Sequence, residues 1–249
     1  MKIHFIGVGD ACDGLNGNTS ILVTTCDDTT ILLDCGFSVP HSFFQHYDDP
    51  DRPDMVWISH LHGDHCFGIP LLLLRLWEMG RRKPLLFIGN HHLKGHVQKT
   101  MELAYPGIFG RLSFPIFFQS VESGQSFNLE HLIFRFASTI HFQPNLGILL
   151  DDGEKKVYYS GDGRPTEDIE ELARDCDLAI HESFLLRDEI PNHGSVAGSL
   201  ELTEKANIKQ LALVHLDRTF RINSNDELQD VLTRHSMVFL PANGQSIVL

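Results

Sequence analysis

The sequence lacks three features that would each have placed it in a large class of proteins. No apolar run approaches the ~20 residues that cross a membrane, since the longest, 69–74, ends at Arg75. The N-terminus has no apolar core followed by a small-residue cleavage site, so we expect a cytoplasmic protein that makes no membrane contact. The five cysteines form no CxxC pair and no framework spacing, which argues against a disulfide scaffold.

Basic residues are also scarce. Lys and Arg number 20 against 33 Asp and Glu, which gives a formal net charge of −13. Because proteins that bind nucleic acids broadly carry a basic excess or patch, extensive contact with RNA is disfavoured. Histidine, in contrast, is abundant at 15 residues. The positions of these histidines decide the function that we predict.

Short strand-like runs alternate with longer helical runs along the whole chain, without a linker or a repeat. The length of 249 residues suits one domain with a large core or two small domains. Mixed strands and helices predict a layered α/β fold. The predicted strands are 3–7, 20–24, 30–34, 55–59, 85–88, 114–118, 131–138, 146–150, 156–160, 178–181 and 210–215. The predicted helices are 68–79, 92–104, 167–176 (capped by Thr166) and 195–207.

The strongest motif directly follows the apolar run 55–59. It has the spacing HxHxDH and consists of His60, His62, Asp64 and His65. Imidazole and carboxylate ligands suit zinc and other divalent first-row metals. A helix would direct these side chains apart, so we expect a tight turn at Gly63 to let them converge.

Three further polar residues lie at or just after the end of a predicted strand, the position where α/β folds build their sites. They are His141, Asp162 and His215. Together with the HxHxDH motif, they make the sequence resemble the metallo-β-lactamase superfamily over nearly its whole length. The resemblance implies a four-layer αβ/βα sandwich, formed by residues 1–249 as a single domain. It also implies two divalent metal ions, which we expect to be zinc, although the same ligands suit manganese or iron.

The resemblance assigns a role to each of these residues. It implies that Asp34, in the segment Leu-Asp-Cys-Gly, orients one ligating imidazole. The first metal would be held by His60, His62 and His141, the second by Asp64, His65 and His215, and Asp162 would bridge both.

The flanking segments resemble ribonuclease Z and its small phosphodiesterase relatives. The segment 160–165, SGDGRP, is similar to their SGDTRP, with Gly163 in place of threonine. The segment 181–184, HESF, is similar to their HEATF-like segment, and 192–197, NHGSVA, matches a segment whose histidine contacts the phosphate.

These matches imply catalytic roles for three residues. His193 would donate a proton to the leaving oxygen, and its ordinary pKa of ~6.5 suits that task. Glu182 would orient His193 or carry the proton. Asp64, besides holding a metal, would orient the nucleophile.

One departure from ribonuclease Z bears on the substrate. That family has a long tRNA-binding arm between the positions of His141 and Asp162, whereas here 20 residues separate them and predict a plain hairpin. We therefore predict a phosphodiesterase that cleaves a small anionic or cyclic nucleotide-like phosphodiester through metal-bound hydroxide. The alternatives are a ribonuclease Z-like RNA 3′-end endonuclease, a thioester or lactone hydrolase, and a non-catalytic metal-binding accessory protein. A homodimer is expected from the resemblance alone.

Overall fold

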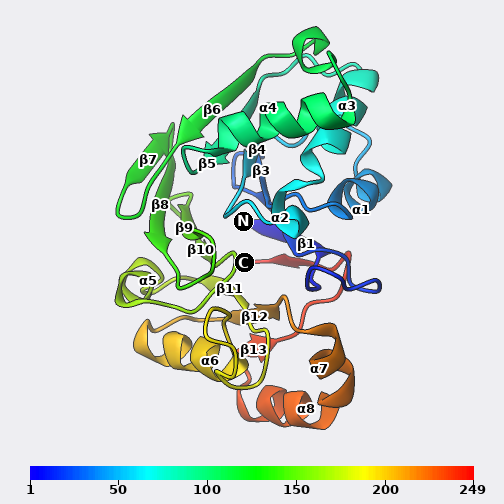
Figure 1. Ribbon diagram of the computed structural model, residues 1–249. Helices are drawn as coiled ribbons and strands as arrows, with labels where there is room; N and C mark the ends of the chain where they lie inside the picture. The colour runs from blue at the N-terminus through cyan, green and yellow to red at the C-terminus, as the bar shows by residue number, and fades with distance from the viewer.

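Two seven-stranded β-sheets pack face to face, and helices cover both outer faces (Figure 1). The computed structural model describes all residues, 1–249. The strand order is β14-β1-β2-β3-β4-β5-β6 in the first sheet and β13-β12-β11-β10-β9-β8-β7 in the second. This arrangement confirms the predicted four-layer αβ/βα sandwich.

The first sheet is antiparallel from β14 to β3 and parallel from β3 to β6. Parallel neighbours require crossover connections, which the helices provide. The strands are β1 (Lys2–Gly7), β2 (Ser20–Thr24), β3 (Thr30–Leu33), β4 (Met55–Trp57), β5 (Leu85–Gly89), β6 (Ile116–Ser120) and β14 (Ser246–Val248). The helices are α1 (Val39–His46), α2 (Gly63–Cys66), α3 (Ile69–Glu78), α4 (Leu93–Ala104) and the short 3₁₀ helix η1 (Phe109–Arg111).

The second sheet is antiparallel from β7 to β10 and parallel from β10 to β13. Its strands are β7 (Ser126–Leu129), β8 (Leu132–Ser138), β9 (Leu146–Asp151), β10 (Lys156–Tyr159), β11 (Leu178–Glu182), β12 (Leu211–Val214) and β13 (Val238–Phe239). The helices are α5 (Glu167–Leu172), α6 (Val196–Lys205), α7 (Arg218–Asn223) and α8 (Asn225–Arg234). None of the helices in the structure, in either half, is both long and apolar enough to cross a bilayer.

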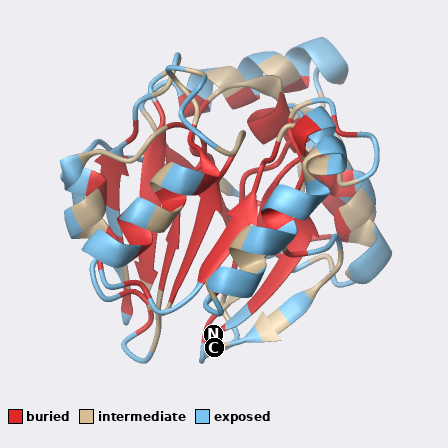
Figure 2. Cartoon of the chain, turned by 90° about the horizontal axis from the view of Figure 1, so that it is seen from below, coloured by how far each residue is buried: buried red, intermediate tan, exposed pale blue.

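Three apolar layers hold the sandwich together. The central layer lies between the sheets, where Trp57 of β4 stacks on Phe136 of β8 with ring centroids 5.0 Å apart. The other two lie between each sheet and its helices. In Figure 2 the inner strands of both sheets are buried, whereas the long helices turn an exposed side to solvent. The edge strands β6, β7 and β14 are mostly exposed or half-buried. The strand ends that carry the polar motifs are therefore held by a rigid interior.

Some element boundaries differ from those predicted. The helix predicted over 167–176 ends at Leu172, because the chain turns soon afterwards through a left-handed residue, Asp175. β6 begins two residues later than predicted and lies at a sheet edge, which leaves Phe117 56% exposed. Helices α1, α7 and α8 were not predicted.

Candidate metal centre

The histidine-rich segment after β4 occupies a loop and one short helix. His60 and His62 lie in the loop, whereas Asp64 and His65 lie in α2, which has only four residues. The expectation of a turn without a helix was wrong, since α2 begins at Gly63. The helix makes little more than one turn, and the side chains that it carries still converge with those of the loop.

Three further side chains reach the same point from the second sheet. His141 follows β8, Asp162 follows β10 and His215 follows β12. These three strands point in the same direction, so their carboxyl ends meet at one edge of the sheet. His215 adopts a left-handed conformation with φ of 56°, which ends β12 and turns the chain toward α7.

Two groups of four side chains converge, and the candidate donor atoms within each group all lie within 4.8 Å of one another. Asp162 belongs to both groups: its Oδ2 lies 3.7 Å from His60 Nε2, and its Oδ1 lies 3.3 Å from His65 Nε2. The first group is His60, His62, His141 and Asp162, and the second is Asp64, His65, Asp162 and His215. The structure thus brings together all seven residues that the sequence singled out as ligands.

This set of donor atoms fits divalent metal ions, because imidazole nitrogens and carboxylate oxygens are among their usual ligands. Such an ion is typically bound by four ligand atoms. Two of the converging atoms, His65 Nε2 and Asp162 Oδ1, are buried without a hydrogen-bond partner. Buried polar atoms in folded proteins are nearly always satisfied, and a cation between the groups would satisfy both. The buried cluster is of the kind that holds two metals in metallo-β-lactamase folds.

Asp34, at the end of β3, fixes the position of one imidazole in the second group. Its Oδ2 lies 2.7 Å from His65 Nδ1 and also accepts hydrogen bonds from Ser59 Oγ (2.8 Å) and Tyr159 Oη (2.7 Å). With the Nδ1 proton directed at Asp34, the Nε2 lone pair of His65 faces the centre. This geometry suits the orienting role that the resemblance implies for Asp34.

The charges within the cluster stabilise one another. Burial raises the pKa of Asp162, but His215 and His65 lower it more, so the carboxyl pKa falls well below its usual value. For His215, burial lowers the pKa, but the charge of Asp162 and the hydrogen bond with Asp64 raise it well above normal. Metal binding requires ionised carboxylates and neutral imidazoles, so an ion bound to His215 would displace the proton that these charges hold on its ring.

His193 and Glu182 form a second, adjoining unit. Glu182 is the last residue of β11 and is fully buried, and its Oε1 lies 2.5 Å from His193 Nδ1. Its Oε2 accepts hydrogen bonds from the backbone N–H groups of Gly163 and Gly194. The ring of Phe184 stacks on His193 with centroids 4.6 Å apart. Glu182 and Phe184 therefore hold the His193 ring in a fixed position beside the cluster of candidate metal ligands.

Comparison with known proteins identifies the family. A family profile described as "Anti-Pycsar protein Apyc1" matches residues 1–238. The chain belongs to this family. Ribonuclease Z of Bacillus subtilis (strain 168) is 23% identical to it over 287 aligned residues, which cover 92% of each chain.

Solved structures agree with this assignment at the level of the fold. The short form of human tRNase Z superposes on this Apyc1-family chain with a TM-score of 0.83 at 21% identity, over 100% of this chain and 99% of that one. The metallo-β-lactamase fold protein YhfI of Bacillus subtilis gives 0.79 at 21% identity, over 99% and 98%. Family, fold and buried cluster together identify a metal-dependent hydrolase of the metallo-β-lactamase superfamily.

A pocket of about 400 Å³ opens onto the cluster of this Apyc1-family protein and is lined by His62, Asp64, Asp162, His193 and His215, among others. Two charged residues that line this pocket were not predicted from the sequence: Asp10, in the loop after β1, and Arg218, at the start of α7. The position of Arg218, three residues after the candidate ligand His215, could have indicated that it lies near the cluster. Nothing in the sequence indicated this for Asp10, because only the fold brings it to the pocket.

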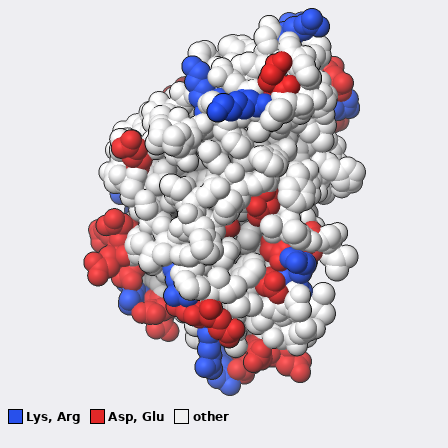
Figure 3. Space-filling view, in the orientation of Figure 1, with Lys and Arg blue, Asp and Glu red and all other residues white.

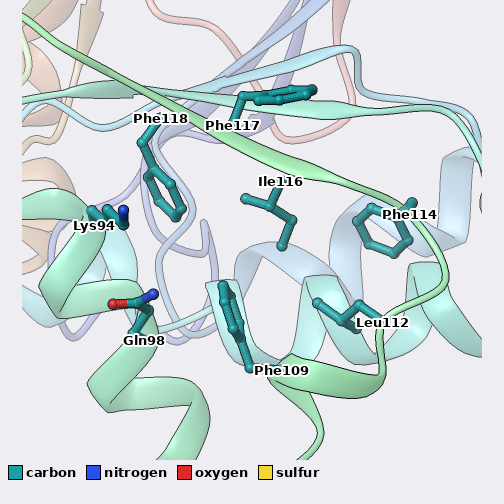
Figure 4. A pocket seen from close by; sticks show the side chains of 8 residues that line it. All are labelled: Lys94, Gln98, Phe109, Leu112, Phe114, Ile116, Phe117 and Phe118. Atoms are coloured by element: carbon teal, nitrogen blue, oxygen red, sulfur yellow. The ribbon is translucent and has the colours of Figure 1, made fainter.

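A separate cavity of about 430 Å³ lies between α4 and β6 (Figure 4). Phe109, Phe114, Ile116 and Phe118 supply most of its apolar lining. It contains no imidazole or carboxylate, so it offers no group for hydrolysis. The pocket at the metal cluster is where the chemistry of this Apyc1-family chain is concentrated.

Proposed function

We propose that this protein is a dinuclear metal-dependent phosphodiesterase whose substrate is a small cyclic nucleotide. One observation carries the proposal: His193, held through Nδ1 by Glu182, lines the same pocket as Asp64, Asp162 and His215. A centre that can activate water thus shares a pocket with a group that can protonate a leaving oxygen. Phosphodiester hydrolysis benefits from both, because an alkoxide leaves poorly without a proton.

The seven clustered residues would divide between two divalent ions. The chemistry that bound divalent ions supply is a lowered pKa of water and neutralisation of the phosphate charge. Two such ions carry +4 and the two carboxylates −2, so the centre attracts anionic substrates. His60, His62 and His141 would hold the first ion and Asp64, His65 and His215 the second, with Asp162 shared.

The residues of this chain would then direct ring opening. Asp64 accepts a hydrogen bond from the attacking water and orients it toward phosphorus. The bond between phosphorus and one ester oxygen breaks, and His193 Nε2 gives its proton to that oxygen while Glu182 holds the opposite ring nitrogen. The hydroxyl of the attacking water becomes bonded to phosphorus, and the remaining proton of that water reprotonates His193 Nε2. One water is therefore consumed for each ring opened.

Two features favour a small substrate over RNA. Residues between His141 and Asp162 form only the β9–β10 hairpin, without a long arm. The net charge is −13, and the face in Figure 3 shows scattered Lys and Arg rather than a continuous basic surface. Membership in a family described as anti-Pycsar also supports the proposed substrate. Likeness to proteins named ribonuclease Z supports the reaction rather than the substrate, since RNA linkages are also phosphodiesters.

The test is hydrolysis of bis(p-nitrophenyl) phosphate by protein loaded with zinc or manganese, followed by assays of 3′,5′-cyclic nucleotides. We expect metal-dependent turnover of both substrates, which Asp64→Ala abolishes. His193→Ala should lower turnover of 3′,5′-cyclic nucleotides, whose leaving group is an alkoxide, about 10²–10⁴-fold. It should affect bis(p-nitrophenyl) phosphate much less, because p-nitrophenolate leaves without a proton. A protein that holds two metals and turns over neither substrate would contradict the proposal.

The alternative functions give different results in the same assays. Cleavage of precursor tRNA with steep salt dependence would indicate an RNA 3′-end endonuclease. A thioester leaves as a thiolate, which needs little protonation, so a thioesterase would tolerate His193→Ala. Metal binding with no turnover of any ester would indicate an accessory protein.

A further inference from the structure

A second cavity adjoins the pocket at the metal cluster. It has a volume of about 340 Å³ and lies between the loop that follows β1 and helix α7. Arg218 lines both cavities and so stands at their junction. A molecule bound at the cluster therefore has one neighbouring space into which the rest of it can extend.

Arg218 is fixed in place and still has free donors. Its Nη1 lies 2.9 Å from Asp10 Oδ2 and 3.1 Å from Oδ1, and its backbone N–H also donates to Oδ2 (3.0 Å). Asp10 is 1% exposed, whereas the Arg218 side chain is 49% exposed. Nε and Nη2 have no acceptor within the protein, and Arg218 is the only Lys or Arg that lines the cluster pocket. A held guanidinium with unused donors is suited to a phosphate oxygen.

The second cavity has the character of a site for an uncharged, planar group. Leu15 and Ile222 line it with apolar side chains that are 80% and 67% exposed. Asn16 and Asn223 add amide groups: Asn16 uses its Nδ2 on Asp13, which leaves its carbonyl oxygen free. Leu15 and Ile222 are the only apolar residues among the nine that line the cavity, so it offers many hydrogen-bonding groups beside a limited apolar contact, which suits the polar edge and flat faces of a nucleobase.

The charges beside this cavity are balanced. Arg218 is paired with Asp10, and Arg221 lies in the field of Asp13. Two cations and two carboxylates leave no net attraction for a second phosphate. The cavity thus differs from the cluster pocket, where bound ions would leave a positive charge.

We propose that the second cavity binds the nucleoside part of the substrate, with its base between Leu15 and Ile222, and that Arg218 bonds to a phosphate oxygen. This assignment rests on the proposed function. It makes the substrate a mononucleotide whose phosphodiester lies at the metal cluster. The role of Arg218 is to set the position of the phosphate relative to the base.

Steady-state kinetics on two substrate types test the cavity. Bis(p-nitrophenyl) phosphate has no nucleoside, whereas 3′,5′-cyclic nucleotides of the four common bases do. We expect Ile222→Ala and Asn223→Ala to raise KM for at least one cyclic nucleotide about tenfold, and to raise it less for bis(p-nitrophenyl) phosphate. Leu103→Ala, a matched control on α4 at 84% exposure, should change neither.

Arg218 is tested separately, because its pairing with Asp10 also ties α7 to the β1 loop. Arg218→Gln should raise KM for both substrate types, and Arg218→Lys should restore part of the loss. A purely structural role predicts instead a lower melting temperature with KM unchanged, and that result would overturn the assignment of Arg218.

The two proposals fail in different ways. Wild-type protein that cleaves bis(p-nitrophenyl) phosphate but no cyclic nucleotide overturns the substrate class, and the cavity assignment with it. Wild-type protein that cleaves cyclic nucleotides, while Ile222→Ala and Asn223→Ala leave KM unchanged, overturns the cavity assignment alone.

Discussion

Gly163 determines where Asp162 lies, although it contributes no side chain to the cluster. It adopts φ of 102°, and a Cβ there would lie 2.6 Å from the carbonyl oxygen of Ile140. This close approach lets Arg164 pair with Ile140 by two backbone hydrogen bonds (3.0 and 3.1 Å). The pairing places the segment that carries Asp162 beside the residue that precedes His141.

Gly163→Ala should therefore lower both stability and metal affinity. A positive φ alone costs a non-glycine residue about 1–2 kcal/mol, and the contact with Ile140 adds to that cost. Gly153→Ala is the matched control, because Gly153 has φ of 83° but no atom within 4 Å of the place that an added methyl group would occupy. Urea unfolding should show a larger loss for Gly163→Ala than for Gly153→Ala, and equal losses would contradict the steric argument.

At the level of single residues, the sequence was informative wherever side-chain type and spacing carry the chemistry. His60, His62, Asp64 and His65 stand close together in the sequence, and they stand close together in the structure. Asp10 could not be found in this way, since its partner Arg218 lies 208 residues away and only the fold joins them.

Among the elements, helix α5 has a capping residue, Thr166, that makes hydrogen bonds both to its own helix and to a strand. Thr166 Oγ1 accepts a hydrogen bond from Ile169 N (3.2 Å), as the sequence predicted for a helix cap, and donates to Ser138 O (2.9 Å) at the end of β8. The cap thus also ties the helix to the strand that leads toward His141. Glu167, Asp168 and Glu170 in the first turn complement the helix dipole.

Thr166→Ala should cost about 1 kcal/mol in the free energy of unfolding, the usual loss for a missing cap. Thr233→Ala is a suitable control, because Thr233 lies near the end of α8 and bonds only to Gln229 O within its own helix. Chemical denaturation of both variants measures the difference. A loss for Thr233→Ala as large as that for Thr166→Ala would show that the cap contributes nothing specific.

The elements that the sequence did not predict include very short ones and also two longer helices, α1 with eight residues and α8 with ten. β13 has two residues and β14 has three, too few for an alternating pattern to be recognised. Helix α7 has six residues, and its capping residue Asp217 is recognisable only once its hydrogen bond to Phe220 N is seen. Pairing of β14 with β1 joins segments more than 230 positions apart, which no local pattern encodes.

Across the whole molecule, the candidate ligands come from both halves of the sandwich. Four lie in the segment after β4 of the first sheet, and three follow strands of the second. A metal ion bound between them would link the two sheets directly. Ligands that bind only the folded state raise its stability, so the centre should contribute to the stability of the entire fold.

Removal of metal should therefore lower the melting temperature of the whole protein in a single transition. We expect zinc to restore the melting temperature of chelator-treated protein, and Asp162→Ala to lose most of that shift. His193→Ala should keep the shift, because His193 is not among the proposed ligands. Two separate transitions in scanning calorimetry would instead contradict the expectation that residues 1–249 form one domain.

The shared position of Asp162 has a consequence for how the centre fills. Both ions would draw on the same carboxylate, so their affinities are thermodynamically linked rather than independent. The first ion bound would fix the Asp162 side chain in the position that the second ion needs, and its charge would at the same time repel the second ion. Titration of metal-free protein should then give two unequal binding steps, and a singly loaded protein would be a distinct species with its own properties.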